Sequence, residues 1–175
     1  TGGHSGGMIH LEKGNSIVLA ARAIEEAVAK GMDFELVSFT GGEKNNAIPR
    51  VAAITFASDT SFEKIARLIK ESEDHIKTEL EFSDGGVTVK VEESEKSDKC
   101  IKDGIKIVDC AYLMPNGFQH RSMVIEGLTV TSLNLGVVTT SESEVVLDTL
   151  IRSAIDSAAH DLKNRLHILA HRLGL

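Results

Sequence analysis

The chain opens on a histidine set among glycines, Gly2-Gly3-His4-Ser5-Gly6-Gly7. Glycines let the backbone come close to a ligand, so an imidazole here can bind a metal or donate a hydrogen bond to a reacting group. An anion cradle is the other use of such glycines, but the spacing fits neither the dinucleotide pattern nor the P-loop, since Lys13 precedes Gly14. From these residues alone a plain turn histidine is the favoured interpretation of His4, and a ligand or hydrogen-bond donor is the alternative.

Ser5 follows this histidine directly and is a candidate nucleophile. Adjacent residues in an extended chain point to opposite sides, so His4 is badly placed to take a proton from the Ser5 hydroxyl. We therefore do not expect a serine nucleophile here.

Three further histidines, His160, His167 and His171, share one face of a predicted C-terminal helix. That helix carries its apolar residues on the other side: Leu162, Leu166, Leu169 and Leu173. His160 and His167 are about 10 Å apart along the axis, so one ion cannot bind all three. A solvated face is the expectation, with a metal shared by His167 and His171 as the alternative, and no other part of the sequence resembles a complete zinc site.

Two other segments place polar groups between or at the ends of strands. Asn46 lies in Asn45-Asn46-Ala47-Ile48-Pro49-Arg50, where asparagine and proline usually make a turn. Arg152 ends an apolar strand, and its guanidinium can hold a carboxylate with two hydrogen bonds. A structural ion pair explains this arginine equally well.

The elements that position these residues follow from the spacing of apolar residues and from turn signals. The first half predicts a strand over 8–11, a helix over 17–28, strands over 34–39 and 51–57, and a helix over 60–80. The second half predicts a strand over 87–91, a charged link over 93–98, a helix over 101–112, strands over 128–140 and 144–151, and a helix over 155–173.

This order predicts an α+β fold, a two-layer sandwich with a mainly antiparallel, ferredoxin-like sheet and helices on one face. Strand, helix, strand, strand, helix occurs twice, which allows two βαββα halves, 1–83 and 84–175, within one domain over 1–175. The halves share no sequence identity that would indicate a duplication.

Composition narrows the class of protein. The chain has 175 residues and a net charge of −7, from 19 basic and 26 acidic residues, which disfavours nucleic acid and anionic membranes as partners. Neither a membrane span nor a leader is evident, so a cytoplasmic location is expected.

Cys100 and Cys110 fall in one predicted helix, about 15 Å apart, too far for a disulfide. Because the chain begins at Thr1, we expect its natural start to lie upstream.

Taken together, several motifs resemble one family. They are Gly-Gly-His-Ser-Gly-Gly-Met-Ile-His at 2–10, Gly-Asn at 14–15, Asn-Ala-Ile-Pro-Arg at 46–50, Pro-Asn-Gly at 115–117, Thr-Ser-Leu-Asn-Leu-Gly-Val-Val at 131–138 and Leu-Ile-Arg-Ser-Ala-Ile-Asp-Ser at 150–157. This set is similar to the aminoacyl-histidine dipeptidases, also called Xaa-His or beta-alanyl-histidine dipeptidases, which are two-zinc peptidases. The chain resembles their lid domain, which is inserted into the catalytic domain, and the resemblance is weakest over 81–112.

The resemblance implies a role for three residues. His4 matches a lid histidine that stabilises the tetrahedral oxyanion, Asn46 a substrate-binding asparagine, and Arg152 an arginine that grips the substrate carboxylate. The two zinc ions and the general base belong, by the same resemblance, to a catalytic domain outside this chain, so the fragment alone is expected to bind no metal pair and to be inactive.

The expected partners are this catalytic domain and a dipeptide substrate. Some related enzymes form homodimers in which the lid histidine comes from the partner subunit, and others double the lid within one chain; the sequence leaves both open. The alternative function is a stand-alone α+β module that senses a small ligand or dimerises.

Overall fold

The structure, a computed structural model, describes residues 2–175; Thr1, where the predicted domain begins, lies outside the described residues. Its elements are β1 (Gly3–His4), the 3-10 helix η1 (Ile9–Leu11), α1 (Ser16–Ala29), β2 (Glu35–Gly41), β3 (Ala47–Ile48), β4 (Ala52–Ala57), α2 (Phe62–Glu79), α3 (Glu81–Asp84), α4 (Gly104–Leu113), β5 (Gly117–Arg121), β6 (Thr129–Thr140), β7 (Val145–Ser153) and α5 (Asp156–Leu173).

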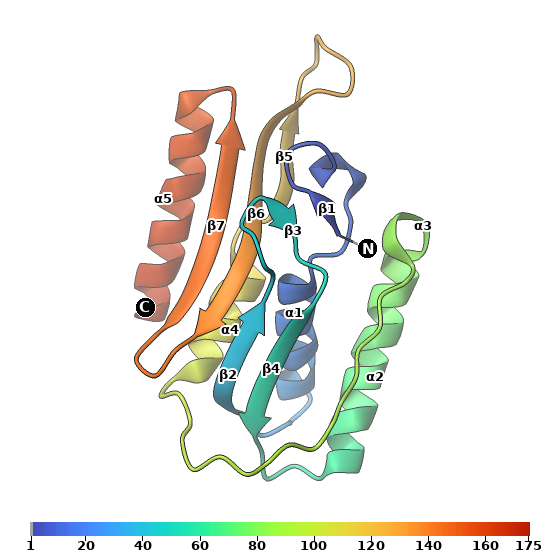
Figure 1. The fold of residues 1–175 in the computed structure, drawn as a ribbon, viewed down its shortest axis with the longest axis vertical. Helices are drawn as coiled ribbons and strands as arrows, with labels where there is room; N and C mark the ends of the chain where they lie inside the picture. Colours follow the sequence, from blue (N-terminus) through green and yellow to red (C-terminus); the bar gives the residue numbers. More distant parts are fainter. Residues whose placement is uncertain (1) are drawn as a thin grey trace.

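The strands form a five-stranded antiparallel sheet and a small two-stranded one (Figure 1). In the large sheet β4 pairs with β2, β2 meets β6 at Gly41 and Val138, and β7 runs along the other edge of β6. The first part of β6 pairs with β5, where Gly117 lies opposite Leu133. The twelve-residue β6 is therefore the strand that joins the two halves of the chain.

The helices form the second layer. Helix α1 packs against α2 and α4, and α4 packs against α5. Figure 1 shows α1 and α4 behind the central strands, with α2 and α5 at the two sides. The core between the layers is apolar and closed to solvent at Ile17, Leu36, Phe39, Val108 and Leu135. This arrangement confirms the predicted α+β class with helices packed on an antiparallel sheet.

The helix order α2, α1, α4, α5 accompanies the strand order β4, β2, β6, β7, so each half of the chain supplies neighbouring helices and neighbouring strands, with β5 as a further strand from the second half. The division into halves 1–83 and 84–175 stays a prediction.

Two predicted strands are wrong, and one predicted helix starts later than expected. The segment over 8–11 contains a 3-10 helix, because its apolar run is too short to hold a strand partner. The segment over 87–91 is not a strand; Val89 packs on the core, but its amide donates to the Glu73 carboxylate on α2 at 3.1 Å instead of to a neighbouring strand. The predicted helix over 101–112 begins only at Gly104, which leaves Cys100 exposed outside it, while Cys110 is buried within it.

Strand β5 was not predicted, because Gly117-Phe118-Gln119-His120-Arg121 lacks a regular alternation and follows a Pro-Asn turn signal. None of the helices described is long and apolar enough to cross a membrane.

Candidate functional site

His4 and Asn46 lie next to each other in the two-stranded sheet. Strand β1 ends at His4, which pairs with Ala47 at the start of β3. The Ser5 amide donates a hydrogen bond to the Asn46 carbonyl at 3.0 Å. The pairing of a two-residue strand with a turn thus brings together residues that lie more than forty positions apart in the sequence.

Arg152 reaches the same place from the large sheet. A Cβ atom built on Gly6 would lie 3.1 Å from His4 Cε1 and 3.5 Å from Arg152 Cζ, so the imidazole and the guanidinium both border the Gly6 backbone. Both side chains are exposed. The structure therefore gathers all three residues singled out by the sequence analysis around the glycine-rich segment.

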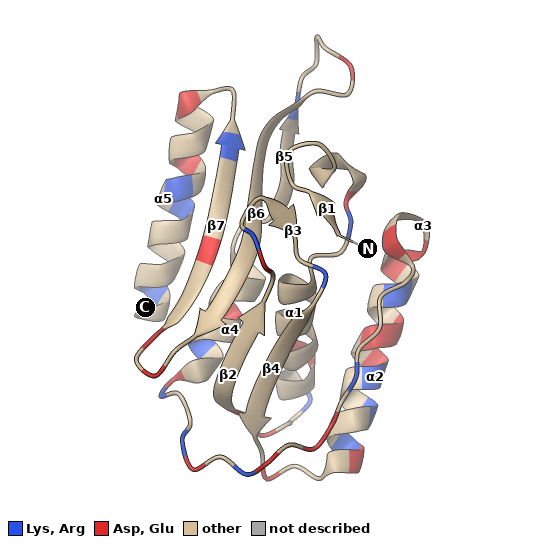
Figure 2. Cartoon of the chain, in the orientation of Figure 1, with Lys and Arg blue, Asp and Glu red and all other residues tan. Residues whose placement is uncertain are grey.

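The site lies on the face of the large sheet that turns away from the helices. Successive side chains of a strand point to opposite faces. On β7, a crevice on the helix side is lined by Val145, Leu147, Thr149 and Ile151. Arg152 belongs to the other set. Figure 2 shows basic residues in blue at the end of β7.

The hydrogen bonding of His4 determines which ring nitrogen can act on a ligand. The Gly6 amide donates to His4 Nδ1 at 3.1 Å, so Nδ1 is the acceptor of the ring. In the neutral imidazole the proton then resides on Nε2, which remains a hydrogen-bond donor. The turn thus makes Nδ1 the acceptor and leaves Nε2 as the donor of the neutral ring.

Ser5 is not placed as a nucleophile, although Gly3-His4-Ser5-Gly6-Gly7 has the letters of the Gly-x-Ser-x-Gly elbow. Its side chain is 1% exposed, and a turn follows β1 in place of the helix that such an elbow requires. The Ser5 Oγ has no hydrogen-bond partner in the described part of the chain. A hydroxyl buried in this way cannot attack a substrate.

Three asparagines that the sequence analysis did not assign to the site form hydrogen bonds with the backbone near it. Asn15 caps α1 by accepting from Ile17 and Val18, and its Nδ2 donates to the Leu135 carbonyl at 2.9 Å. Asn116 accepts from the Leu135 amide at 2.8 Å. Asn134 donates to the segment that carries Asn46. The signal for Asn134 is an asparagine between two leucines inside a strand, where this residue type is rare.

Among residues 2–175 no group of three or more His, Cys, Asp or Glu side chains could hold a metal ion. His160, His167 and His171 are exposed on α5, in agreement with the predicted solvated face, and the ring of His160 is hydrogen-bonded to the Asp156 carbonyl at 2.8 Å. The residues present do not fit a zinc pair.

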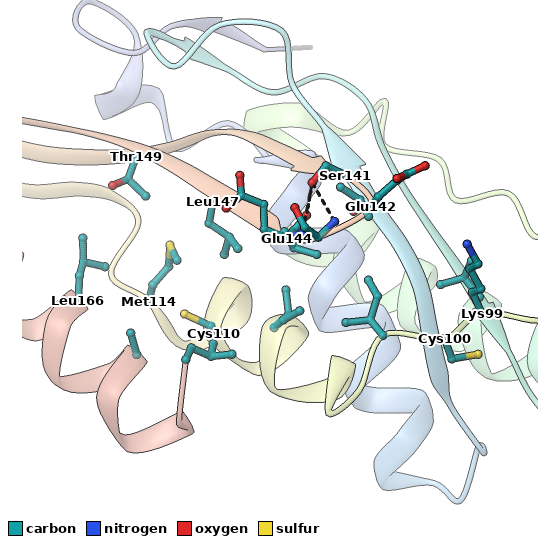
Figure 3. Close-up of a pocket in the computed structure, with 18 of the residues that line it drawn as sticks. Lys99, Cys100, Cys110, Met114, Ser141, Glu142, Glu144, Leu147, Thr149 and Leu166 are labelled. Carbon is teal, nitrogen blue, oxygen red and sulfur yellow. Dashed lines mark hydrogen bonds between the residues drawn. The ribbon is translucent and has the colours of Figure 1, made fainter.

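The crevice on the helix side is a separate feature (Figure 3). It has a volume of about 1250 Å³ and lies between α4, α5 and the sheet, with the sulfur atoms of Cys110 and Met114 among its apolar lining. The mouth is bordered by the β6–β7 turn, where Ser141 and Glu144 are hydrogen-bonded to each other. Neither His4, Asn46 nor Arg152 lines it.

Comparison with known proteins agrees with this fold. Residues 1–84 match the peptidase dimerisation domain family. Over 99% of its length the chain is 32% identical to the cytosol non-specific dipeptidase of Escherichia coli (strain K12), of which it spans 36%. The solved aminoacylhistidine dipeptidase of Vibrio alginolyticus superposes with a TM-score of 0.88 at 36% identity, over 99% of this chain and 36% of that one.

The first half of the chain is thus similar to a peptidase dimerisation domain, and the whole chain is similar in fold to part of a solved aminoacylhistidine dipeptidase. The matches over nearly the whole chain also confirm the resemblance to the aminoacyl-histidine dipeptidases, and the chain corresponds to little more than a third of such a protein.

Proposed function

We propose that the chain is the lid of a two-zinc dipeptidase that hydrolyses Xaa-His, carnosine-like dipeptides, and that it caps the bound substrate. The observation that carries this proposal is that His4 and Arg152 both lie close to the Cβ position of Gly6, with Asn46 directly before the strand that pairs with His4. A hydrogen-bond donor and a carboxylate-binding cation at one exposed place suit a small substrate with a free carboxylate.

Each residue then has a distinct task. The Arg152 guanidinium binds the substrate carboxylate with two charge-assisted hydrogen bonds and so fixes its orientation. The Nε2–H of His4 donates to the carbonyl oxygen as negative charge develops on it. Asn46 contributes a polar contact to the substrate, and closure of the lid excludes water from the contacts that these residues make.

The metal ions and the general base are placed by this proposal in a catalytic domain outside the chain. Because the described residues offer no cluster of metal ligands, the chain by itself is expected to be inactive. A cytoplasmic location is proposed as well, since a relative is named a cytosol dipeptidase.

Dimerisation is the second candidate function, and it is favoured by the description of the family that residues 1–84 match. Dimerisation and a lid function can be told apart by experiment. A chain whose main task is dimerisation self-associates at micromolar concentration in analytical ultracentrifugation, and loss of its dimer abolishes activity even when His4 and Arg152 are intact.

The test of the lid function uses the intact dipeptidase that contains this chain. His4→Ala is expected to lower kcat by about a hundredfold, the range for removal of one oxyanion donor, with little change in KM. His10→Ala is the matched control, since His10 is exposed on the neighbouring η1. Equal kinetics of the two variants would overturn the proposed function.

A further inference from the structure

Each of the three carbonyl groups in the segment over 45–47, which contains Asn46, accepts a hydrogen bond. The carbonyls of Asn45 and Ala47 both accept hydrogen bonds from Nδ2 of Asn134, each at 2.8 Å. The carbonyl between them, that of Asn46, accepts from the Ser5 amide at 3.0 Å on the opposite side. The backbone on both sides of Asn46 is thus fixed, by β6 in one direction and by the glycine-rich segment in the other.

Strand β6 is shaped to receive this segment. A Cβ on Gly136 would lie 2.3 Å from Asn45 Cα, so only glycine permits the approach at this position. The register of β6 against β7 shifts at the same point, between Leu135 and Val137. A bulge and a neighbouring glycine leave space beside a strand, so the backbone of another segment can approach it closely.

Burial of the Asn134 side chain in this strand is energetically unfavourable. It is 2% exposed between two fully buried leucines, and its Oδ1 has no donor among the residues that the structure describes. A buried acceptor without a partner destabilises the folded state. Its two donated hydrogen bonds, both to the Asn46 segment, are the interactions that offset this cost.

We propose that Asn134 is a positioning residue for substrate binding, which acts by setting the place of Asn46 relative to His4 and Arg152. The inference rests on the proposed function, because it needs Asn46 to contact the substrate. It adds a residue that touches no substrate itself and that works only through Asn46.

The experiment is a double-mutant cycle in the intact dipeptidase, with a dipeptide as substrate. Asn134→Ala is expected to raise KM by about tenfold and to change kcat little, because the contacts of a misplaced Asn46 are lost in binding. In an Asn46→Ala background the same substitution is expected to change KM less than about twofold, because the residue through which it acts is gone. Asn164→Ala on the exposed face of α5 is the control.

A merely structural Asn134 gives a different result, in which its variant lowers the melting temperature and has the same effect on KM with and without Asn46. That outcome overturns the inference and leaves the proposed function standing. Unchanged kinetics of both His4→Ala and Asn46→Ala would instead overturn the proposed function. Should Asn134→Ala fail to fold, Asn134→Ser goes through the same cycle, since its hydroxyl keeps a donor in the strand.

Discussion

His4 and Arg152 come from opposite ends of the chain and border one backbone position, that of Gly6. His4 Cε1 and Arg152 Cζ lie 3.1 Å and 3.5 Å from the point at which a side chain at Gly6 would begin. The glycine between them is therefore as much a part of the candidate site as the two functional groups.

Gly6→Ala tests this arrangement. The added methyl group would meet the imidazole more closely than ordinary van der Waals contact allows, so the ring must move. We expect kcat/KM of the intact dipeptidase to fall by about tenfold, because small misplacements of a catalytic group have large effects. Gly7→Ala is the matched control, since a Cβ there meets no atom within 4 Å. Equal effects of the two substitutions would contradict the arrangement.

Arg152→Ala tests recognition of the substrate carboxylate. Loss of a charge-assisted, two-pronged hydrogen bond is expected to raise KM for a free dipeptide by about a hundredfold. A dipeptide with an amidated C-terminus lacks the carboxylate, so the wild type and the variant should handle it equally. Arg165→Ala on the exposed face of α5 serves as control. The role fails if the variant discriminates between the two substrates as well as the wild type does.

Glu25→Gln tests the contact between α1 and α4. Burial, followed by the charge and the hydrogen bond of Asp109, raises the pKa of Glu25 from 4.5 to about 7. Stability from this group is complete below about pH 4.5 and is lost as the pH rises through about 7, because the unfolded chain releases the proton first. The variant should thus gain roughly 1–2 kcal/mol over the wild type between about pH 5 and pH 8, a figure that allows for partial exposure.

Urea denaturation at both pH values measures this difference in the free energy of unfolding. Glu142→Gln, in the exposed β6–β7 turn, is the control. A stability difference independent of pH would show that the Glu25 carboxyl does not titrate near neutrality.

Glu73→Gln tests how the segment over 87–91 is attached to α2. Burial raises the pKa of Glu73, but hydrogen bonds from Lys70, Lys77 and the Val89 amide outweigh it and hold the pKa at about 2. The ionised carboxylate therefore stabilises the fold above about pH 4.5, and this contribution is lost as the pH falls toward about 2. We expect the variant to lose roughly 1–2 kcal/mol at neutral pH and to exchange the Val89 amide proton faster. Glu63→Gln at the exposed start of α2 should change neither quantity.

The two cysteines should differ in reactivity. Cys100 is exposed and Cys110 is buried in α4. Burial, with the nearby charge of Asp109, raises the pKa of the Cys110 thiol, which disfavours the reactive thiolate. A disulfide-exchange reagent should label one thiol in the folded chain and the second only after unfolding. Labelling of both at the same rate would mean that α4 opens readily.

The fold was predictable where the spacing of apolar residues reports a shared core. The stripe from Ile17 to Val28 gave α1, and the long apolar run after Leu128 gave β6. The alternation over 87–91 is equally regular, but it lacks a neighbouring strand, and a side chain on α2 takes its amide instead. Periodicity shows which residues face the core and says nothing about which backbone groups bond to one another.

The candidate site was predictable only as three separate residues. His4, Asn46 and Arg152 were chosen by their resemblance to family motifs, and their proximity depends on the pairing of β1 with β3 and on the register of β7. Asn134 was missed because its partners are carbonyl groups, which carry no sequence signal.

The hydrogen bond from Asn15 to the Leu135 carbonyl spans 120 residues and has a consequence for the order of events during synthesis. When a ribosome has released only the first half, the open edge of β2 has no β6 to pair with, and the cap of α1 lacks its anchor. Exposed strand edges of this kind favour aggregation, and contacts of such long range slow folding. We therefore expect the isolated first half to aggregate more readily than the complete chain.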